Sequence, residues 1–311
     1  MSELISTPEG DGVFRSGFVT IVGRPNVGKS TLVNALVGTK VAIVSDKPQT
    51  TRTAIRGVRT TQASQIVLLD TPGVHRPRTV LGERTNQRAV ESLASVDIVC
   101  VLVAANERVG PGDRFVADLA TRAKPQARIA VVSKTDVATK EAVADQLTVL
   151  ASGDLGEFDA FVPISARSGA GLDALVAELE QRLPEGPSYY PPGAVSDQPE
   201  SFLAAELVRE QLLAGAREEL PHSITVSVDE VEERTTKSGE PLLALRCIVR
   251  VERESQKGIV IGKGGERLKR AGRAARLEME SLLGTRVHLE TRVKVDPDWQ
   301  QRPAALDRLG Y

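Results

Sequence analysis

The stretch GRPNVGKS, residues 23–30, decides the fold of the first part of the chain. It matches the pattern G-x-x-x-x-G-K-[S/T] and lies between FVTIVG (18–23), a predicted strand, and KSTLVNALVG (29–38), a predicted helix. In such a loop, backbone N–H groups and the helix N-terminus bind phosphate groups. We therefore predict that Lys29 reaches the outer phosphates of a nucleotide and that the Ser30 hydroxyl binds Mg²⁺. The predicted phosphate site comprises Gly23, Arg24, Pro25, Asn26, Val27, Gly28, Lys29, Ser30 and Thr31.

Strands and helices alternate beyond this loop. Four apolar runs rich in Val and Ile are typical of buried strands: QIVLLD (65–70), DIVCVLVAA (97–105), RIAVVS (128–133) and AFVPISA (160–166). Three amphipathic runs between and after them predict helices: 84–96, 112–123 and 171–183. Residues 42–70 depart from strict alternation and predict a polar loop followed by an antiparallel edge hairpin. The pattern indicates a doubly wound α/β domain with a mostly parallel sheet.

Three short motifs follow predicted strands and indicate a guanine nucleotide. In DTPG (70–73), Asp70 can hold a magnesium-bound water and the Gly73 N–H can touch the terminal phosphate. In SKTD (133–136), Lys134 can lie over the base and Asp136 can accept from the ring N–H and the amine of guanine. Ligands in this fold bind at the carboxyl ends of strands. The predicted nucleotide site also contains Thr71, Pro72, Ser133 and the SAR motif Ser165, Ala166 and Arg167.

In this order, these motifs make residues 18–183 similar to a translation-factor-class GTPase domain. DKPQTTR (46–52) resembles the first switch of that class. The resemblance implies that Thr51 closes on Mg²⁺ and the γ-phosphate, with Thr50 as its neighbour. It implies Lys29, Thr51 and Gly73 as catalytic residues, and Ser30, Thr51 and Asp70 as Mg²⁺ ligands.

The chain departs from that class at two positions. Ser133 stands where the guanine motif usually has asparagine, so base affinity is expected to be weaker. Val74 stands where Ras-like enzymes carry a glutamine that orients the attacking water, which predicts slow unaided GTP hydrolysis. The resemblance also implies that Asn26 helps to hold K⁺. We interpret His75 as a solvated residue of the switch loop rather than a catalytic base.

A proline-rich linker separates a second part from the first. We divide the chain into a flexible N-terminus (1–15), the GTPase domain (16–184), the linker (185–199) and a second domain (200–311). The charge of this second domain is polarised: residues 200–245 carry 4 basic and 10 acidic side chains, a net charge of −6, and residues 246–294 carry 13 basic and 6 acidic, a net charge of +7.

The basic half contains VIGKGGERLKR (260–270), which fits the pattern G-x-x-G. Such a turn is often only a tight connection. The predicted order helix, strand, strand, helix, helix, strand nevertheless resembles a type II KH domain, whose G-x-x-G loop clamps about four nucleotides of single-stranded RNA by their backbone. Aromatic residues make up only 3% of the chain, which argues against an RNA-binding domain that stacks bases on aromatic side chains, such as an RRM or OB-fold. The implied RNA-binding residues are Ile259, Val260, Ile261, Gly262, Lys263, Gly264, Gly265, Arg267, Lys269 and Arg270, with Leu268 as a further candidate.

A GTPase domain followed by one type II KH domain, with a closing W…LGY segment (299–311), resembles the Era-type bacterial GTPases. This implies a GTP/GDP switch that binds the 3′ end of 16S rRNA and acts in assembly of the 30S ribosomal subunit. Two alternatives remain open: a GTPase of a tRNA-modification complex, and a constitutive RNA-binding module with a vestigial GTPase domain.

The composition sets the broad class of the protein. The 40 basic and 41 acidic residues balance, so a charged partner must recognise a local patch. Cys100 and Cys247 each lie in an apolar run and are predicted to be buried small hydrophobes. No run of about 18 apolar residues occurs, and we expect a cytoplasmic monomer. Peripheral association with the inner face of the cell membrane is left open, because some relatives are thought to associate there.

Overall fold

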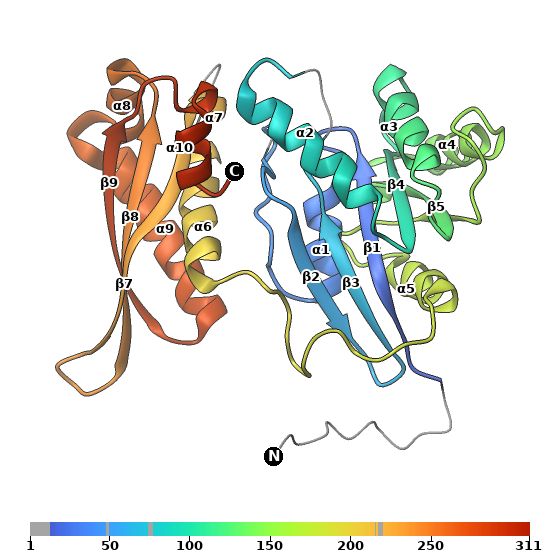
Figure 1. Cartoon of the computed structure of the whole chain (residues 1–311), viewed down its shortest axis with the longest axis horizontal. Helices are drawn as coiled ribbons and strands as arrows, with labels where there is room; N and C mark the ends of the chain where they lie inside the picture. Colours follow the sequence, from blue (N-terminus) through green and yellow to red (C-terminus); the bar gives the residue numbers. More distant parts are fainter. Residues whose placement is uncertain (1–12, 48–49, 74–76, 215, 217–219) are drawn as a thin grey trace.

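The computed structural model describes residues 13–47, 50–73, 77–214, 216 and 220–311, and it divides into two parts (Figure 1). The elements of the first part are β1 (Arg15–Gly23), α1 (Lys29–Val37), β2 (Ile55–Thr60), β3 (Ser64–Asp70), α2 (Val80–Leu93), β4 (Ile98–Ala104), α3 (Pro111–Arg122), β5 (Ala127–Ser133), η1 (Thr135–Val137), α4 (Lys140–Ala151), β6 (Ala160–Pro163) and α5 (Leu172–Arg182). The elements of the second part are α6 (Glu200–Ala214), α7 (Leu220–Ser223), β7 (Thr225–Thr235), β8 (Pro241–Val251), α8 (Glu254–Ile261), η2 (Lys263–Gly265), α9 (Glu266–Leu283), β9 (Arg286–Val295), η3 (Trp299–Gln301) and α10 (Pro303–Arg308).

The first part is a six-stranded sheet in the order β2-β3-β1-β4-β5-β6. All neighbouring strands are parallel except β2 and β3, which form the predicted antiparallel hairpin at one edge. Helices α1 and α5 cover one face of the sheet, and α2, α3 and α4 contribute to the core on the other. The predicted α/β fold is confirmed.

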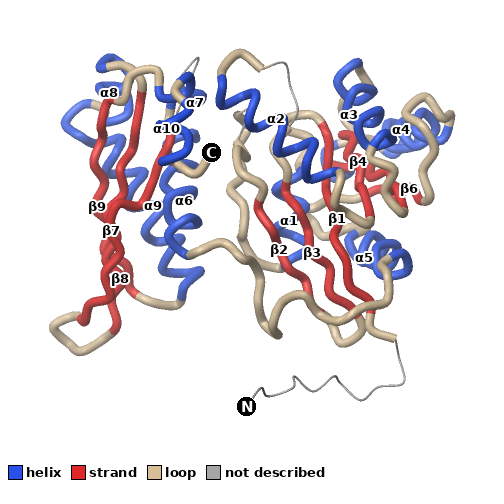
Figure 2. Tube along the Cα trace, viewed as in Figure 1, coloured by secondary structure: helices blue, strands red, loops and turns tan. Residues whose placement is uncertain are grey.

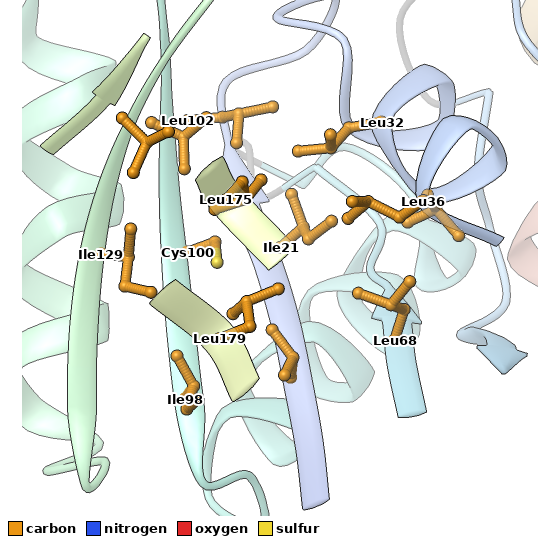
Figure 3. Close-up of a cluster of buried hydrophobic side chains, with 14 of the residues drawn as sticks. Ile21, Leu32, Leu36, Leu68, Ile98, Cys100, Leu102, Ile129, Leu175 and Leu179 are labelled. Atoms are coloured by element: carbon orange, nitrogen blue, oxygen red, sulfur yellow. The ribbon is translucent and has the colours of Figure 1, made fainter. Parts of the chain in front are cut away.

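Strand β4 shows how the sheet separates the two cores. Cys100 and Leu102 point into the layer that Leu32 of α1 and Leu175 of α5 also fill (Figure 3). The intervening side chains of β4, such as Val101, point into the opposite core, because successive residues of a strand face opposite sides. Both cysteines are buried as predicted, and burial raises the pKa of each thiol to about 12.

Three features of the first part differ from the sequence-based expectation. Strand β1 begins at Arg15, within the segment expected to be flexible. Helix α4 was not predicted. It buries little of its surface, only Gln146 and Leu150 being fully buried, so its amphipathic signal is weak. Strand β6 was predicted to be buried, but as an edge strand it buries only Val162 fully.

The second part contains the strands β7, β8 and β9, with helices α6 and α9 beside them (Figure 2). The strands form a sheet in the order β7-β8-β9, with β7 and β8 antiparallel and β8 and β9 parallel. One face of α9 is apolar: Ala271, Ala275 and Met279 are buried in a core that they share with α6 and β8. Ile43, which belongs to the first part of the chain, is also buried in this core.

The two parts contact each other through three segments. The linker lies alongside strand β2 in space, where the Val58 N–H donates to the Val195 carbonyl over 2.9 Å. The C-terminal segment faces α2 (Figure 1), and Trp299 and Leu306 pack against Leu81 of that helix. The loop after α1 contacts α6, as described below. Among the described residues, no helix is long and apolar enough to cross a membrane.

Candidate functional site

The loop between β1 and α1 curves around the ammonium group of Lys29. This group donates to the carbonyl oxygens of Gly23 over 3.1 Å and Arg24 over 3.0 Å. Gly28 has φ +103°, a left-handed conformation that favours glycine. The Lys29 side chain is buried, and burial lowers its pKa to about 8, although the charge of Asp70 opposes the shift. A buried cation at a helix N-terminus makes a strong site for phosphate.

Asp70, Ser30 and Thr51 converge beside this lysine. One carboxylate oxygen of Asp70, Oδ2, accepts from the Ser30 hydroxyl over 2.7 Å and from the Thr51 hydroxyl over 3.0 Å, and the two hydroxyl oxygens lie 3.1 Å apart. Asp70 is fully buried, and that burial raises its pKa against the opposing effects of Ser30, Lys29 and Thr51. Its other oxygen, Oδ1, has no hydrogen-bond partner among the described residues.

These three residues fit a divalent cation. A buried carboxylate with an unpaired oxygen is costly unless something compensates its charge. One carboxylate and two hydroxyls are the hard oxygen ligands that Mg²⁺ prefers. The three side chains come from α1, β3 and the segment before β2, so only the folded chain brings them together.

The loops after β5 and β6 meet at the other end of the site. The Ser133 hydroxyl donates to the carbonyl oxygen of Val27 in the phosphate loop, over 2.7 Å. The Ser165 hydroxyl donates to Oδ1 of Asp136 over 2.8 Å and so orients that exposed carboxylate. Serine therefore keeps one expected function of the usual asparagine, a bond from this strand to the phosphate loop.

A cavity of about 450 Å³ joins the two ends of the site. The predicted residues that line it are Pro25, Asn26, Val27, Gly28, Lys29, Ser30, Thr31, Thr51, Gly73, Ser133, Lys134, Asp136, Ala166 and Arg167. Asp46, Lys47 and Thr50, which belong to the predicted first switch, also line it. The lining residues that sequence reasoning missed are Val44, Ser45, Asn106, Val137 and Ile164. Most of the missed residues flank a motif in the chain, so proximity to the motifs was the available signal.

Several predicted nucleotide-site residues do not line this cavity. Arg24 pairs instead with the buried carboxylate of Asp113 over 2.7 Å. Thr71 is buried and its hydroxyl donates to the Ile21 carbonyl. Gly23, Asp70 and Ser165 are not lining residues, but each is hydrogen-bonded to one: to Lys29, Ser30 and Asp136, respectively. Pro72 is also absent from the lining. Val74 and His75 lie outside the described residues.

The second glycine loop joins α8 to α9. Gly262, Gly264 and Gly265 all have φ between +62° and +80°, and a Cβ at Gly262 would lie 2.7 Å from the Cβ of Arg267. Lys263 is exposed at the tip of the loop. This backbone suits glycine, and the absence of side chains at these positions allows a ligand to approach it closely. The N–H groups of Gly262 and Gly265 donate within the protein, to the carbonyls of Gly258 and Gly262 over 2.9 and 3.0 Å.

The predicted RNA-binding residues differ in how far their side chains are exposed to solvent. Lys263, Lys269 and Arg270 are exposed, and Ile259 is 51% exposed. Arg267 is half-buried, and its guanidinium donates to the Leu212 carbonyl over 3.3 Å. The prediction that Val260 contacts RNA is wrong, because its side chain is fully buried in the core of the second domain.

A groove of about 370 Å³ continues from the loop between α9 and β9. Its lining residues are Gly265, Leu268, Lys269, Gly272, Arg273, Arg276, Leu289 and Thr291. Sequence reasoning missed Arg273 and Arg276. They follow Lys269 at spacings of four and seven residues, which places all three on one face of a helix, and that spacing was the available signal.

Two family descriptions match separate parts of the chain. Residues 18–134 match the family described as a 50S ribosome-binding GTPase. Residues 219–300 match the KH domain.

Curated proteins named GTPase Era are similar over nearly the full chain. The protein from Mycolicibacterium smegmatis is 51% identical over 300 residues, which cover 96% of this chain and 99% of that protein. The protein from Nocardioides sp. is 50% identical over 312 residues, with coverage of 98% and 100%.

Two solved structures share the whole architecture. A variant of Era from Aquifex aeolicus bound to GDP and aluminium fluoride matches with a TM-score of 0.90 and 39% identity, covering 96% of this chain and 99% of that one. An Era complex with MgGDPNP and nucleotides 1506–1542 of 16S ribosomal RNA matches with a TM-score of 0.89 and 38% identity, with the same coverage.

Proposed function

Because this chain belongs to the Era family of GTPases, we propose that it is a GTP-controlled RNA-binding protein of 30S subunit assembly that binds the 3′ end of 16S rRNA. The observation that carries most weight is the convergence of Ser30, Thr51 and Asp70 beside Lys29, in a chain that also carries a basic groove next to a glycine loop. We place the protein in the cytoplasm, where that RNA would be.

The residues of the first site suit GTP hydrolysis to GDP and phosphate. Water attacks the γ-phosphorus in line, and the bond to the bridging oxygen of the β-phosphate breaks. The ammonium of Lys29 neutralises charge on the phosphate oxygens, and the Gly73 N–H donates to the γ-phosphate. Ser30, Thr51 and Asp70 would hold Mg²⁺, which supplies further positive charge there. Valine at position 74 cannot orient water, so we propose slow unaided turnover.

Guanine selectivity is assigned to Asp136. The bond from Ser165 to its Oδ1 orients the carboxylate, whose two oxygens would accept from the ring N–H and the amine of the base. Ser133 contributes by holding the phosphate loop through Val27.

A K⁺ site at Asn26 is part of the proposal. The Asn26 amide nitrogen donates to the Asp46 carbonyl over 2.8 Å, which leaves its Oδ1 as the atom for a monovalent cation. Faster turnover in KCl than in NaCl at equal ionic strength is expected. Equal rates would remove K⁺ from the proposal.

RNA binding is assigned to the glycine loop and the groove beside it. Lys263, Lys269 and Arg270 are exposed around the loop, and Arg273 and Arg276 extend the positive charge along α9. Basic groups at this spacing would contact successive phosphates, while glycine backbone allows the RNA backbone to approach closely.

The test is RNA affinity in two nucleotide states. The full-length protein is titrated with a single-stranded RNA copying the 3′ end of 16S rRNA, at one fixed salt concentration, first with GDP and then with GDPNP and Mg²⁺. Tighter binding with GDPNP is expected. Equal binding in both states would favour a constitutive RNA-binding module, and binding in neither state would refute the assignment of this RNA.

A further inference from the structure

The second domain binds the chain on both sides of Thr51. The Thr51 hydroxyl points into the first domain, toward Asp70 and Ser30. The residue before it, Thr50, presents its carbonyl oxygen to the guanidinium of Arg209 on α6. The residue after it, Arg52, sends its side chain into the second domain. Of these three consecutive residues, the middle one contacts the proposed Mg²⁺ site and its two neighbours contact the second domain.

Arg209 is a preorganised donor. Its side chain is fully buried, and Nε and Nη2 donate to the two carboxylate oxygens of Glu206 over 2.7 and 2.6 Å. A two-point bond to a carboxylate fixes the plane of the guanidinium. The same Nη2 donates to the Thr50 carbonyl. The position of Thr50 is thus set by a residue of α6 that lies 159 positions away in the chain.

Arg52 anchors the other side of Thr51. It is 4% exposed, and its guanidinium donates to the carbonyls of Ile224 over 2.9 Å and His222 over 2.9 Å. The same group lies 5.6 Å from the centroid of the Trp299 ring, within cation–π range. A buried cation is costly without such partners. Arg52 therefore favours the arrangement in which the second domain covers this segment.

We infer that Arg209 and Arg52 are positioning residues of the GTPase site, through which the second domain holds Thr51 where it can bind Mg²⁺ and sense the γ-phosphate. The inference rests on the proposed role of Thr51. It makes the triphosphate-specific contact of the first domain dependent on docking of the RNA-binding domain. Movement of that domain would release Thr51 without any change in the phosphate loop itself.

The test compares GDPNP with GDP binding to the full-length protein in MgCl₂. Thr51→Ala is expected to lower the GDPNP-to-GDP affinity ratio about tenfold, equivalent to ~1.4 kcal/mol. Arg209→Lys, which keeps the charge but loses the forked geometry, is expected to lower the ratio by a similar factor and to raise the Mg²⁺ concentration needed for half-maximal GDPNP binding. The double variant is expected to match Thr51→Ala alone, because both changes remove the same contact.

Lys40→Met is the matched control. Lys40 also joins the two domains, with its ammonium 2.5 Å from carboxylate oxygens of Glu210 and Glu278, but the structure records no bond from it to residues 50–52. The GDPNP-to-GDP affinity ratio of Lys40→Met is expected to stay within twofold of that of the parent protein. Arg52→Lys provides a second variant with the same expectation as Arg209→Lys, should the latter fold poorly.

Each other outcome overturns the inference in a recognisable way. If Thr51→Ala leaves the ratio unchanged, the proposed role of Thr51 fails and the inference with it. If Thr51→Ala lowers the ratio but neither arginine variant does, the proposed function stands and the positioning role is wrong. If the arginine variants weaken GDP and GDPNP equally, or if their effects add fully to that of Thr51→Ala, the arginines support the fold alone.

Discussion

Replacing Asp70 by asparagine is expected to stabilise the nucleotide-free protein while abolishing its response to Mg²⁺ and GTP. Asp70 is fully buried, only its Oδ2 is hydrogen-bonded among the described residues, and burial raises its pKa. Without a cation, folding therefore moves a partly paired negative charge out of water. Asparagine keeps the shape and an acceptor oxygen for Ser30 and Thr51 but removes the charge.

The size of the expected stabilisation follows from Oδ1 of Asp70, which has no hydrogen-bond partner among the described residues. Leaving a buried acceptor unsatisfied costs about 1–3 kcal/mol. Because the asparagine amide also loses hydrogen bonds to water, we expect Asp70→Asn to raise the free energy of unfolding in EDTA by about 1–2 kcal/mol at pH 7. The parent protein should gain about 2.7 kcal/mol when GTP and Mg²⁺ are present at 100 times the dissociation constant, and the variant should gain little. The parent protein should therefore be less stable than Asp70→Asn in EDTA and more stable than Asp70→Asn with GTP and Mg²⁺.

The pH dependence of stability also tests whether Asp70→Asn raises the free energy of unfolding. The pKa of Asp70 in the folded protein is raised above 3.8, the ordinary value of an aspartate side chain in the unfolded chain. Below pH 3.8 the carboxyl group is protonated in both states and carries no penalty. The penalty grows as the pH rises from 3.8 to the raised pKa of the folded state, and it stays constant above that pKa. The stability advantage of Asp70→Asn should accordingly grow from acid to neutral pH.

The assay is urea unfolding followed by far-ultraviolet circular dichroism, because the single tryptophan, Trp299, lies in the second domain and would report on that domain. For the stability in EDTA, Asp136→Asn is the matched control, since Asp136 is exposed and its charge is already hydrated. A parent protein that is more stable than Asp70→Asn in EDTA at pH 7 would refute the reasoning, as would an undiminished response of the variant to Mg²⁺ and GTP.

The remaining predictions concern the two loops and the core of the second domain. GDP affinity should fall as the pH rises through about 8, because the buried Lys29 ammonium has a pKa of about 8 and loses the charge that binds phosphate; a Lys29→Met variant with the same pH profile would contradict this. Asp136→Asn should exchange preference for guanine nucleotides for preference for xanthine nucleotides in competition assays, with RNA binding in the absence of nucleotide unchanged; retained GTP selectivity would exclude the assigned role. Gly264→Asp should abolish RNA binding in a filter assay and leave GDP affinity unchanged, because it adds a negative charge at a left-handed position (φ +62°); loss of both activities would indicate misfolding. Met279→Ala should destabilise the second domain by about 2–5 kcal/mol, measured from the fluorescence of Trp299, because Met279 is fully buried in its core; a loss below about 1 kcal/mol would show that the core repacks around the cavity.

The first domain and much of its site could be predicted from the sequence for a local reason. A phosphate loop is formed by consecutive residues between a strand and a helix, so Lys29 and Ser30 are placed by neighbours in the chain. Asp70 and Asp136 follow strands whose parallel pairing brings their carboxyl ends to one edge. The pattern of strands was therefore sufficient to bring these residues together. The glycine loop at 262–265 was identified in the same way, from its own residues and the order of elements around it.

Other features depend on contacts that no local pattern encodes. Val260 and Ile259 are adjacent in an apolar run, yet one is fully buried and the other is 51% exposed, because α8 turns only one side to the core. Arg24 lies within the phosphate-loop motif but pairs with Asp113 on α3. Sequence determined which residues can bind phosphate, a cation and guanine, because those motifs are contiguous. Tertiary structure alone decided that Arg209 of the second domain holds Thr50, since that bond joins residues 159 positions apart and exists only when the two domains pack together.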